Sequence, residues 1–432
     1  MIPTSQSLPG ILCRILASVA AILVFGSPAA ARSQGLPPPT PTLVTDIRVE
    51  GNERTETHVI LREMQTQVGD PYDPEQASRD RDRIDNLDLF SEVRVDTLWH
   101  ENRMLIRVRV KERLVWLPTE WIPYPILDWS DETGWTYGFG LTNPNESGRN
   151  RSFTLIMEGG GRRTGHFRYS DPWITGNHGS AAVSLVWSEY DDFEGQTNRW
   201  SAVGLGLGTY LGTWGRARLS LEGSEIETDA WRTASGTRRD RIRSLGMGMA
   251  YDTRDVYADP RSGAYAGGFL ERSLPVFDGT VDYASYRLDV RGFRTVTPGR
   301  ILAARASVRY RDRPVPDYRR LRLGGFGNVR GLHPLSFKGR NRILGAVEVR
   351  IVLKEKRSYD FWFVRNVDLG LMAALFGDVG SVWDGDALPA WDEFYGSVGA
   401  GIRILSQQVV RLEVAYSRRD GTRWIAATGM PF

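Results

Sequence analysis

The sequence contains few of the residues that most enzymes and metal sites need. Its 432 residues include one cysteine, Cys13, and five histidines. Because Cys13 precedes an apolar run near the N-terminus, the remaining chain offers no disulfide, no thiolate nucleophile and no cysteine-based zinc site. The histidines are scattered, without the H-x-x-H or H-E-x-x-H spacing of a metal site. We therefore expect no metal, no cofactor and no enzymatic activity.

Long apolar runs and an excess of one charge are also missing. No uninterrupted apolar run reaches the roughly 18 residues that a membrane-spanning helix needs. The 55 basic residues nearly balance the 52 acidic residues, which leaves a net charge of +3. A helical membrane protein is therefore excluded, and no bulk positive charge supports a nucleic-acid partner.

Local patterns that suggest enzymes have simpler interpretations. Residues 204–208 read GLGLG, but this segment belongs to an alternating strand with no helix after it, so a nucleotide loop is excluded. Outer-membrane hydrolases place acidic groups and histidines near their outer rim. We interpret Asp191, Asp192 and His178 instead as solvated loop residues.

The N-terminus has the organisation of a secretory signal peptide. Arg14 precedes the apolar run 15–25, and Ala29, Ala30 and Ala31 supply a small-residue cleavage site. We assign residues 1–31 to this signal peptide and residues 32–42, which include four prolines, to a stiff linker.

Residues 43–114 have the pattern of a small α+β module. A strand is expected around Ile47, followed by helices over 58–64 and 74–89 and by two alternating strands around Val95 and Val108. The order β-α-α-β-β in about seventy residues suits a single sheet with one exposed edge.

This module resembles a POTRA domain. The similarity rests on short elements in a fixed order: Gly51-Asn52 with Thr55, Gly69 with Tyr72, and Leu89-Phe90 running into Val93-Arg94-Val95. The resemblance implies a periplasmic domain that precedes an outer-membrane barrel.

The remaining three hundred residues alternate between apolar and polar positions. Residues 302–310 place Leu302, Val308 and Tyr310 on one parity and arginines on the other, and 245–254 and 343–351 repeat the pattern. Ten or more such segments, each of roughly ten residues, are typical of strands that cross a membrane at a tilt around a polar lumen. The 46 glycines and 11% aromatic residues fit such a fold.

We predict that residues 115–432 form a 16-stranded antiparallel transmembrane β-barrel. Fifteen strands are clear, and a weak first strand lies near 115–125; the even number that bacterial barrels prefer then gives sixteen. The last strand is expected over 422–432. A barrel of this size leaves a wide lumen, and the arginine-rich and glycine-rich segment 312–340 is the predicted inward loop that plugs it.

Within the barrel, the sequence is similar to the BamA/TamA superfamily of outer-membrane assembly and translocation proteins. The inward loop contains GGFGNVRGL at 324–332, similar to the VRGF/Y loop of that family. The other matching segments, in order along the chain, are Tyr169-Ser170-Asp171-Pro172-Trp173, Asp252-Thr253-Arg254-Asp255 with Pro260 and Gly263, Phe376-Gly377-Asp378-Val379-Gly380, and Gly429 with the terminal Phe432. Two features depart from the family pattern: Leu332 replaces the usual aromatic residue, and one POTRA-like module replaces several.

The resemblance implies a contact between the inward loop and the barrel wall. Strand parity places Asp378 on the lumen side, and Arg330 lies near the tip of the loop with glycines on either side. We expect Arg330 to pair with Asp378; the alternative is that each side chain is hydrated in the channel. We refer to Val329, Arg330, Gly331 and Asp378 as the loop lock.

The junction of the first and last strands is the second candidate site. Pro118, Pro123 and Pro125 lie in or near the predicted first strand, and each proline removes one donor from a strand ladder. The predicted last strand contains Gly429 and ends at Phe432. We expect few hydrogen bonds across this lateral seam, which would leave strand edges receptive to an incoming strand. The alternative is that these prolines lie in a linker before the barrel and that the first strand starts later.

The sequence is compatible with two functions. The protein is predicted to insert or translocate client polypeptides by strand templating at the lateral seam; the alternative is a passive pore or structural barrel with a POTRA tether. The expected location is the bacterial outer membrane, with the N-terminal domain in the periplasm. The partners implied are outer-membrane lipids, unfolded outer-membrane or secreted polypeptides, and periplasmic accessory proteins.

Overall fold

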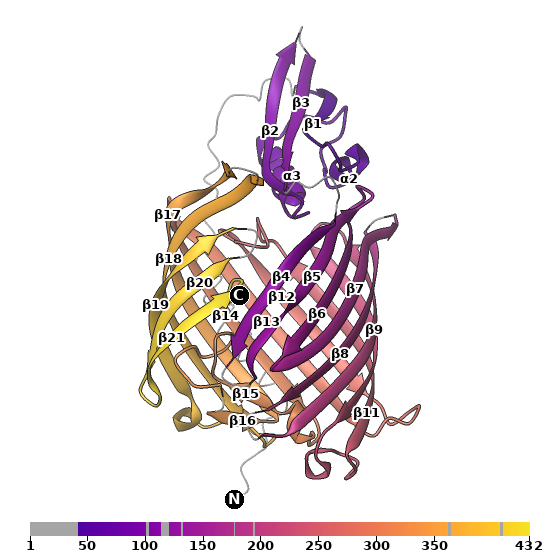
Figure 1. The fold of residues 1–432 in the computed structure, drawn as a ribbon. Coiled ribbons are helices and arrows are strands. Elements are labelled where there is room, and N and C mark those ends of the chain that lie inside the picture. The colour runs from indigo at the N-terminus through magenta and orange to yellow at the C-terminus, as the bar shows by residue number, and fades with distance from the viewer. Residues whose placement is uncertain are drawn as a thin grey trace, which may run out of the picture.

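The computed structural model describes two parts, a small α+β domain and a large β-sheet (Figure 1). The described residues are 42–100, 103–113, 121–130, 133–176, 178–192, 195–334, 336–361, 364–406 and 409–432. The predicted signal peptide, the linker up to residue 41 and Pro118 lie outside the described residues. None of the described helices is long and apolar enough to cross a membrane.

The N-terminal domain follows the β-α-α-β-β order expected from the sequence. Its elements are β1 (Val44–Glu50), α2 (Thr57–Leu61), α3 (Pro74–Asp85), β2 (Phe90–His100) and β3 (Arg103–Glu112). Strand β3 lies in the middle of the sheet, parallel to β1 and antiparallel to β2. Both helices are shorter than predicted, and α3 begins where the Asp73 side chain accepts a hydrogen bond from the Glu75 backbone N–H.

A compact apolar core holds this domain together. Ile60 of α2, Ile84 of α3 and Phe90 of β2 are fully buried against Ile106 and Val108 of β3. Alternate residues of β3 face this core, which is the period-2 burial expected of a strand with one covered face.

The second part is one antiparallel sheet of sixteen strands that curves into a barrel, which confirms the predicted fold class. Its strands are β4 (Ile122–Ser130), β5 (Gly134–Glu146), β6 (Arg151–Gly160), β7 (Arg162–Thr175), β8 (Gly179–Asp191), β9 (Thr197–Leu211), β10 (Gly215–Glu227), β11 (Arg239–Asp252), β12 (Gly263–Ser273), β13 (Tyr283–Thr297), β14 (Arg300–Arg311), β17 (Asn341–Phe361), β18 (Val364–Trp383), β19 (Tyr395–Leu405), β20 (Val410–Ser417) and β21 (Gly421–Thr428).

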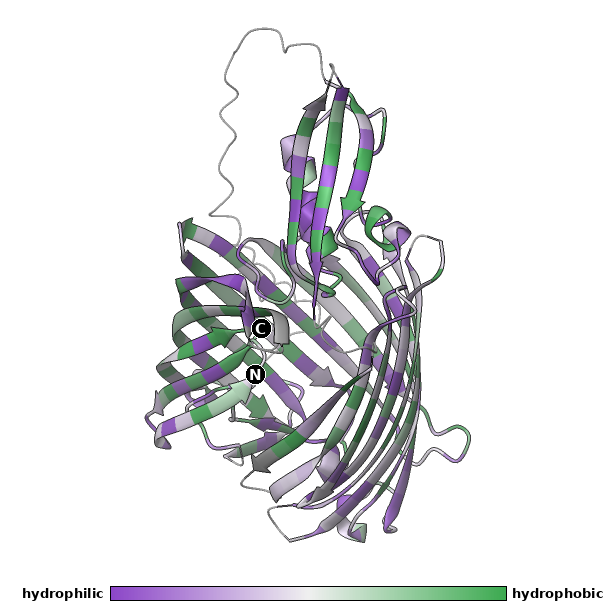
Figure 2. Cartoon of the chain, turned by 45° about the horizontal axis from the view of Figure 1, so that its top comes forward, coloured by the Kyte–Doolittle hydropathy of each residue, from purple (hydrophilic) through white to green (hydrophobic). Residues whose placement is uncertain are grey.

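Side chains alternate along the strands between the outer face of the barrel and the lumen. In β9, Val203, Leu205 and Leu207 are exposed on the outer face, while the residues between them are half-buried. Figure 2 shows the same alternation of apolar and polar residues along most strands of the barrel. Outward apolar side chains match a lipid environment, and the polar parity lines a hydrated lumen.

The small domain sits over one end of the barrel and contacts several of its turns (Figure 1). The Glu56 backbone N–H donates to the Gly148 carbonyl at 2.9 Å, in the turn after β5. The Asn86 side chain of the small domain pairs with the backbone of Asp255 and Tyr257 in the turn after β11. Arg113 forms an ion pair of 3.3 Å with Asp368 of β18. These contacts lie at three separate points of the rim, after β5, after β11 and on β18. The domain is therefore docked onto the barrel rather than only tethered to it.

The segment between β14 and β17 folds inward, as the sequence predicts. It carries two short paired strands, β15 (Leu321–Leu323) and β16 (Phe337–Gly339), and the loop between them lies inside the barrel. Val329 and Leu332 of the loop are completely buried in a cluster with Leu323 and Leu344.

The end of the last strand differs from the prediction. The expected strand over 422–432 stops at Thr428, because Gly429 adopts a left-handed backbone with φ of +80° and turns the chain away from the wall. The tail 430–432 then enters the lumen, where the Phe432 ring packs near Phe293 of β13.

Candidate functional site: an ion-pair network beside two free strand edges

The structure brings the two charged residues of the loop lock together. Arg330 donates to Asp378 of β18 through both Nε and Nη2 at 2.7 Å, and its backbone N–H donates to the same carboxylate at 3.1 Å. Arg330 is 1% exposed. A bidentate arginine–carboxylate pair with a third, backbone donor fixes the loop tip in one orientation against the wall.

Two more carboxylates reach the same guanidinium. Nη1 of Arg330 donates to Glu348 of β17 at 2.7 Å and lies 3.5 Å from Glu413 of β20. The guanidinium carbon lies 3.4 Å from the centre of the Phe376 ring, close enough for a cation–π contact. One loop arginine therefore joins three strands of the wall.

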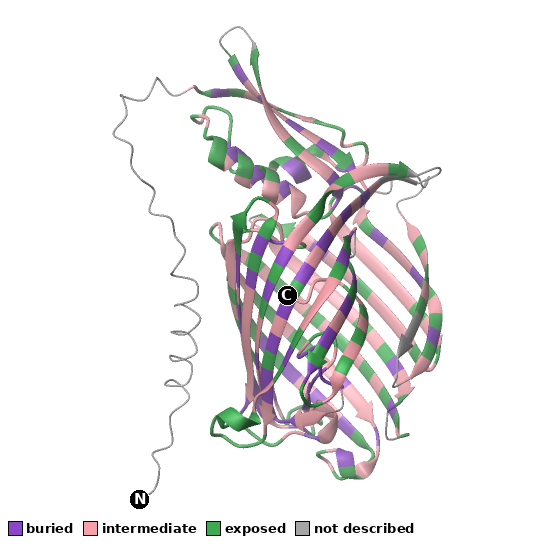
Figure 3. Ribbon diagram, turned by 90° about the vertical axis from the view of Figure 1, so that its left-hand side faces the viewer, coloured by how far each residue is buried: buried purple, intermediate pink, exposed green. Residues whose placement is uncertain are grey.

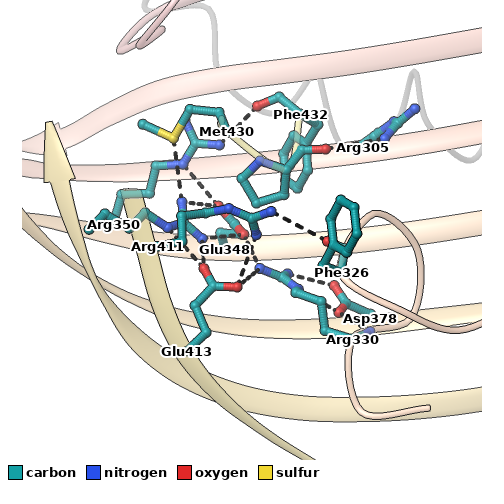
Figure 4. Close-up of polar contacts among 12 residues, drawn as sticks. Arg305, Phe326, Arg330, Glu348, Arg350, Asp378, Arg411, Glu413, Met430 and Phe432 are labelled. Atoms are coloured by element: carbon teal, nitrogen blue, oxygen red, sulfur yellow. Dashed lines mark hydrogen bonds and ion pairs between the residues drawn. The ribbon is translucent and has the colours of Figure 1, made fainter. Parts of the chain in front are cut away.

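The network continues through three wall arginines (Figure 4). Arg403 of β19 donates to both Glu348 and Glu413 at 2.8 Å. Arg350 donates to Glu348 at 3.0 Å, and Arg411 donates to Glu413 at 3.0 Å. Arg330, Arg350, Arg403 and Arg411 thus surround Asp378, Glu348 and Glu413, and all seven side chains are at most 2% exposed.

Burial of so many charges is tolerated only because each has partners. Removing a charged group from water costs several kcal/mol per ion, and a well-placed counter-charge offsets that cost. Loss of one member would leave its partner buried without a counter-charge, as Asp378 would be without Arg330. Figure 3 shows that buried residues gather on the strands that carry this network.

The C-terminal tail is tied to the same network. Arg350 donates to the Phe432 main-chain oxygen at 3.1 Å, while the Met430 sulfur lies 3.7 Å from Nη1 of Arg403. Glu348 accepts from Arg330, Arg350 and Arg403. Glu348 therefore links Arg330 of the loop to Arg350 and Arg403, the two arginines that contact the tail.

Gly331 is required by a close approach rather than by a turn. A Cβ atom at this position would lie 2.6 Å from the Ser397 Cβ and 3.0 Å from the Tyr416 backbone, both in the wall. The Gly331 carbonyl accepts a hydrogen bond of 2.8 Å from the Ser417 hydroxyl. The left-handed turn of the loop falls instead at Gly324 and Gly325, with φ of +114° and +89°.

The lateral seam contains only part of the residues assigned to it. Pro123 and Pro125 lie in β4, opposite Leu141 and Phe139 of β5. Gly429 marks the turn beyond β21, and Phe432 lies in the lumen rather than in the wall. Phe432 therefore does not form part of the seam as the sequence predicts, because its ring packs near Phe293 and its main-chain oxygen accepts from Arg350.

Both free edges of the large sheet border this seam. The hydrogen-bonded order runs from β21 to β4 through all sixteen strands, and no ladder among the described residues joins these two. In Figure 1 the two edge strands face each other across the front of the barrel. The seam thus combines two unpaired edges with a tail that has left the wall.

His178 and Asp192 are held in place by side-chain contacts, which differs from the expectation that they are solvated loop residues. His178 lies between the rings of Trp173 and Tyr210, each with a centroid distance of 3.9 Å, and its Nε2 is 3.2 Å from Glu63 of the small domain. Asp192 is buried against Arg232. His178 therefore helps to dock the small domain, which the isolated loop position does not indicate.

The fold and the site define an outer-membrane β-barrel with one periplasmic POTRA domain. The model of the Omp85 superfamily domain matches residues 145–421, and the model of a surface antigen variable number repeat, a POTRA domain, matches residues 42–113. The chain therefore belongs to the Omp85 superfamily.

Curated relatives and solved structures agree with this assignment. The outer membrane protein assembly factor BamA of Nitratidesulfovibrio vulgaris is 24% identical over 83% of this chain and 46% of its own length; that of Neisseria meningitidis is 20% identical over 89% and 53%. The chain spans about half the length of these relatives.

Two solved structures share the fold. BamA of Haemophilus ducreyi lacking POTRA domains 1–3 has a TM-score of 0.58 at 16% identity, covering 89% of this chain and 84% of that one. CdiB of Escherichia coli has a TM-score of 0.55 at 12% identity, covering 98% and 97%.

Proposed function

We propose that this protein inserts client polypeptides into the outer membrane, or translocates them across it, by templating strands at the seam between β4 and β21. The observation that carries the proposal is the pair of free edges in an otherwise continuous sheet. In a bilayer, unpaired backbone groups are costly, so a free edge favours pairing with an added strand.

The prolines of β4 concentrate the missing donors on one edge. In a regular antiparallel ladder, residues two apart direct their N–H groups to the same neighbour. Pro123 and Pro125 are two apart, and β4 keeps its register with β5 through both of them. The positions without donors therefore fall on the edge that faces β21, where they weaken closure of the barrel.

The ion-pair network connects this seam to the inward loop. The tail after β21 is held in the lumen by Arg350 and Arg403, and both arginines bind Glu348 together with Arg330 of the loop. In this proposal, the network keeps the last strand short and the seam receptive. No bond-breaking chemistry, cofactor or metal is needed.

The names of the relatives support the same class of function. BamA proteins are outer membrane protein assembly factors. By analogy, the proposed clients are unfolded outer-membrane or secreted polypeptides that reach the seam from the periplasm, helped by accessory proteins and by the surrounding lipids.

Depletion of the protein tests the proposal against a passive pore. If the protein assembles clients, depletion lowers the amounts of other barrels or secreted proteins at the cell surface, and a plasmid copy restores them. A plasmid copy of Arg330→Ala serves as the test variant. At an equal level of folded protein, it should restore the other barrels and secreted proteins poorly compared with the wild-type copy. Unchanged levels of all client classes after depletion would favour a passive pore with a tether.

A further inference from the structure

A second group of arginines lines the lumen away from the loop lock. Arg218 of β10 lies opposite Gly248 of β11, which is opposite Phe269 of β12. Phe269 is opposite Arg287 of β13, Arg287 is opposite Arg309 of β14, and Arg309 is opposite Arg342 of β17. These six positions form one continuous cross-strand line. We call Arg218, Arg287, Arg309 and Arg342 the arginine row.

The arginine row lacks the counter-charges that the loop lock has. Among the described residues, no ion pair joins any of its four members to a carboxylate, and Arg342 donates only to the Arg322 carbonyl at 3.1 Å. The charges acting on Arg309 are mainly those of other arginines, opposed by Glu271. Glu271 itself accepts a hydrogen bond from the Tyr283 hydroxyl. The row therefore keeps a clear excess of positive charge.

This arrangement weakens the barrel rather than stabilising it. Like charges directly opposite each other on neighbouring strands are destabilising. Arg287, Arg309 and Arg342 occupy three consecutive strands in direct register, so the unfavourable contact occurs twice. Fold stability gives no reason for such a row, whereas a bound anion would.

Local geometry holds the first two arginines around an aromatic ring. The guanidinium carbons of Arg218 and Arg287 lie 4.4 Å and 5.6 Å from the Phe269 ring centre. A Cβ atom at Gly248 would lie 2.8 Å from the Phe269 ring and 3.1 Å from Nε of Arg218. Gly248 thus leaves the space through which Arg218 reaches Phe269, and the ring orients both cations.

Part of the row is reached from the periplasmic side. A cavity of about 740 Å³ is lined by Arg62 and Arg83 of the POTRA domain and also by Arg218, Phe269 and Arg287 of the barrel. A ligand entering beneath the POTRA domain therefore meets Arg218 and Arg287 first, and Arg309 and Arg342 continue the row beyond them.

We propose that the arginine row binds an anion that carries several phosphate groups. Guanidinium groups match phosphate oxygens in pairs, and neighbouring strands space Arg287, Arg309 and Arg342 at about 4.8 Å, which suits an extended chain of phosphates. The phosphates belong either to a soluble oligophosphate or to lipid headgroups. This proposal stands independently of strand templating, because it concerns the opposite wall of the lumen.

Calorimetric titration of the full chain in neutral detergent tests the proposal. One arm uses inorganic tripolyphosphate, and the other uses a short-chain cardiolipin, which carries two phosphate groups, below its micelle concentration. We expect saturable binding in at least one arm, weakened at least tenfold in the double variant Arg287→Gln/Arg309→Gln and weakened by added salt. Arg163→Gln is the control, since it removes one exposed arginine far from the row.

The two arms separate the sources of phosphate. Row-dependent binding of tripolyphosphate alone supports a soluble ligand, and row-dependent binding of the lipid supports a headgroup. Absence of saturable binding in both arms, or equal affinity of the wild type and the double variant, overturns the proposal. Heat-modifiability on electrophoresis shows that the double variant is folded, and its transition should lie at or above that of the wild type.

Discussion

The lumen contains two sets of arginines with opposite physical consequences. Arg330, Arg350, Arg403 and Arg411 are buried and share three carboxylates. The arginine row instead makes no ion pair with a described residue, and it places Arg309 directly opposite both Arg287 and Arg342. The first set holds a loop and a strand tail in place. The second set leaves charge available for a ligand. The same side chain therefore serves structure on one wall and recognition on the other, according to its neighbours.

The largest effect is expected at the centre of the paired set. Arg330→Ala should lower the free energy of unfolding by about 3–5 kcal/mol, because it leaves the buried Asp378 carboxylate without a counter-charge. The temperature of the heat-modifiability transition measures this loss. An unchanged transition would show that the pair with Asp378 is hydrated and does not hold the loop.

A change at Glu348 should release the tail as well as the loop. Glu348→Gln removes the charge that binds Arg330, Arg350 and Arg403, so we expect destabilisation of about 3 kcal/mol or more. Release of the tail is measured by the labelling rate of Pro431→Cys with a hydrophilic maleimide. Equal labelling rates with and without the Glu348→Gln substitution would mean that the network does not hold the tail.

An intermediate effect is expected from steric change in the loop. Gly331→Ala should cost about 1–3 kcal/mol, because the added methyl group has no room against Ser397 and Tyr416. Gly327→Ala is the matched control in the same loop, since no atom lies within 4 Å of its added Cβ. Equal transition temperatures for the two variants would contradict the close packing of the loop.

The smallest effect, and one of opposite sign, is expected in the arginine row. Arg309→Gln removes a repulsive contact on each side, so the free energy of unfolding should stay equal or rise by about 0.5 kcal/mol. The same heat-modifiability assay compares this variant with Arg330→Ala. A loss as large as that of Arg330→Ala would abolish the distinction between the two sets.

The sequence predicts the alternation of residues along each strand well, but it predicts contacts between residues far apart in the chain poorly. Strand parity placed Asp378 on the lumen side, and the family resemblance supplied its partner, Arg330. Glu348 and Glu413 were visible only as polar positions of alternating strands. Their contacts with Arg403 depend on the register of β17, β19 and β20. Glu348 and Arg403 are 55 positions apart in the sequence, and no local sequence pattern predicts that register.

The path of the tail cannot be predicted from the sequence for a different reason. Alternation through β21 gives no sign that the strand ends at Thr428, and only Gly429 and Pro431 mark the change of direction. The attraction of the tail to Arg350 and Phe293 is a tertiary effect that overrides strand periodicity.

A disulfide across the seam tests the central claim most directly. Cysteines replace Tyr124 in β4 and, in a small panel, Ala426, Ala427 or Thr428 in β21; Cys13 is the one native cysteine. The control disulfide joins Leu412→Cys to Ala426→Cys, which are already paired in the β20–β21 ladder. Strand templating predicts that the seam disulfide abolishes client assembly and that reduction restores it, while the control disulfide has no effect. Full function of the oxidised, cross-linked protein would contradict the account.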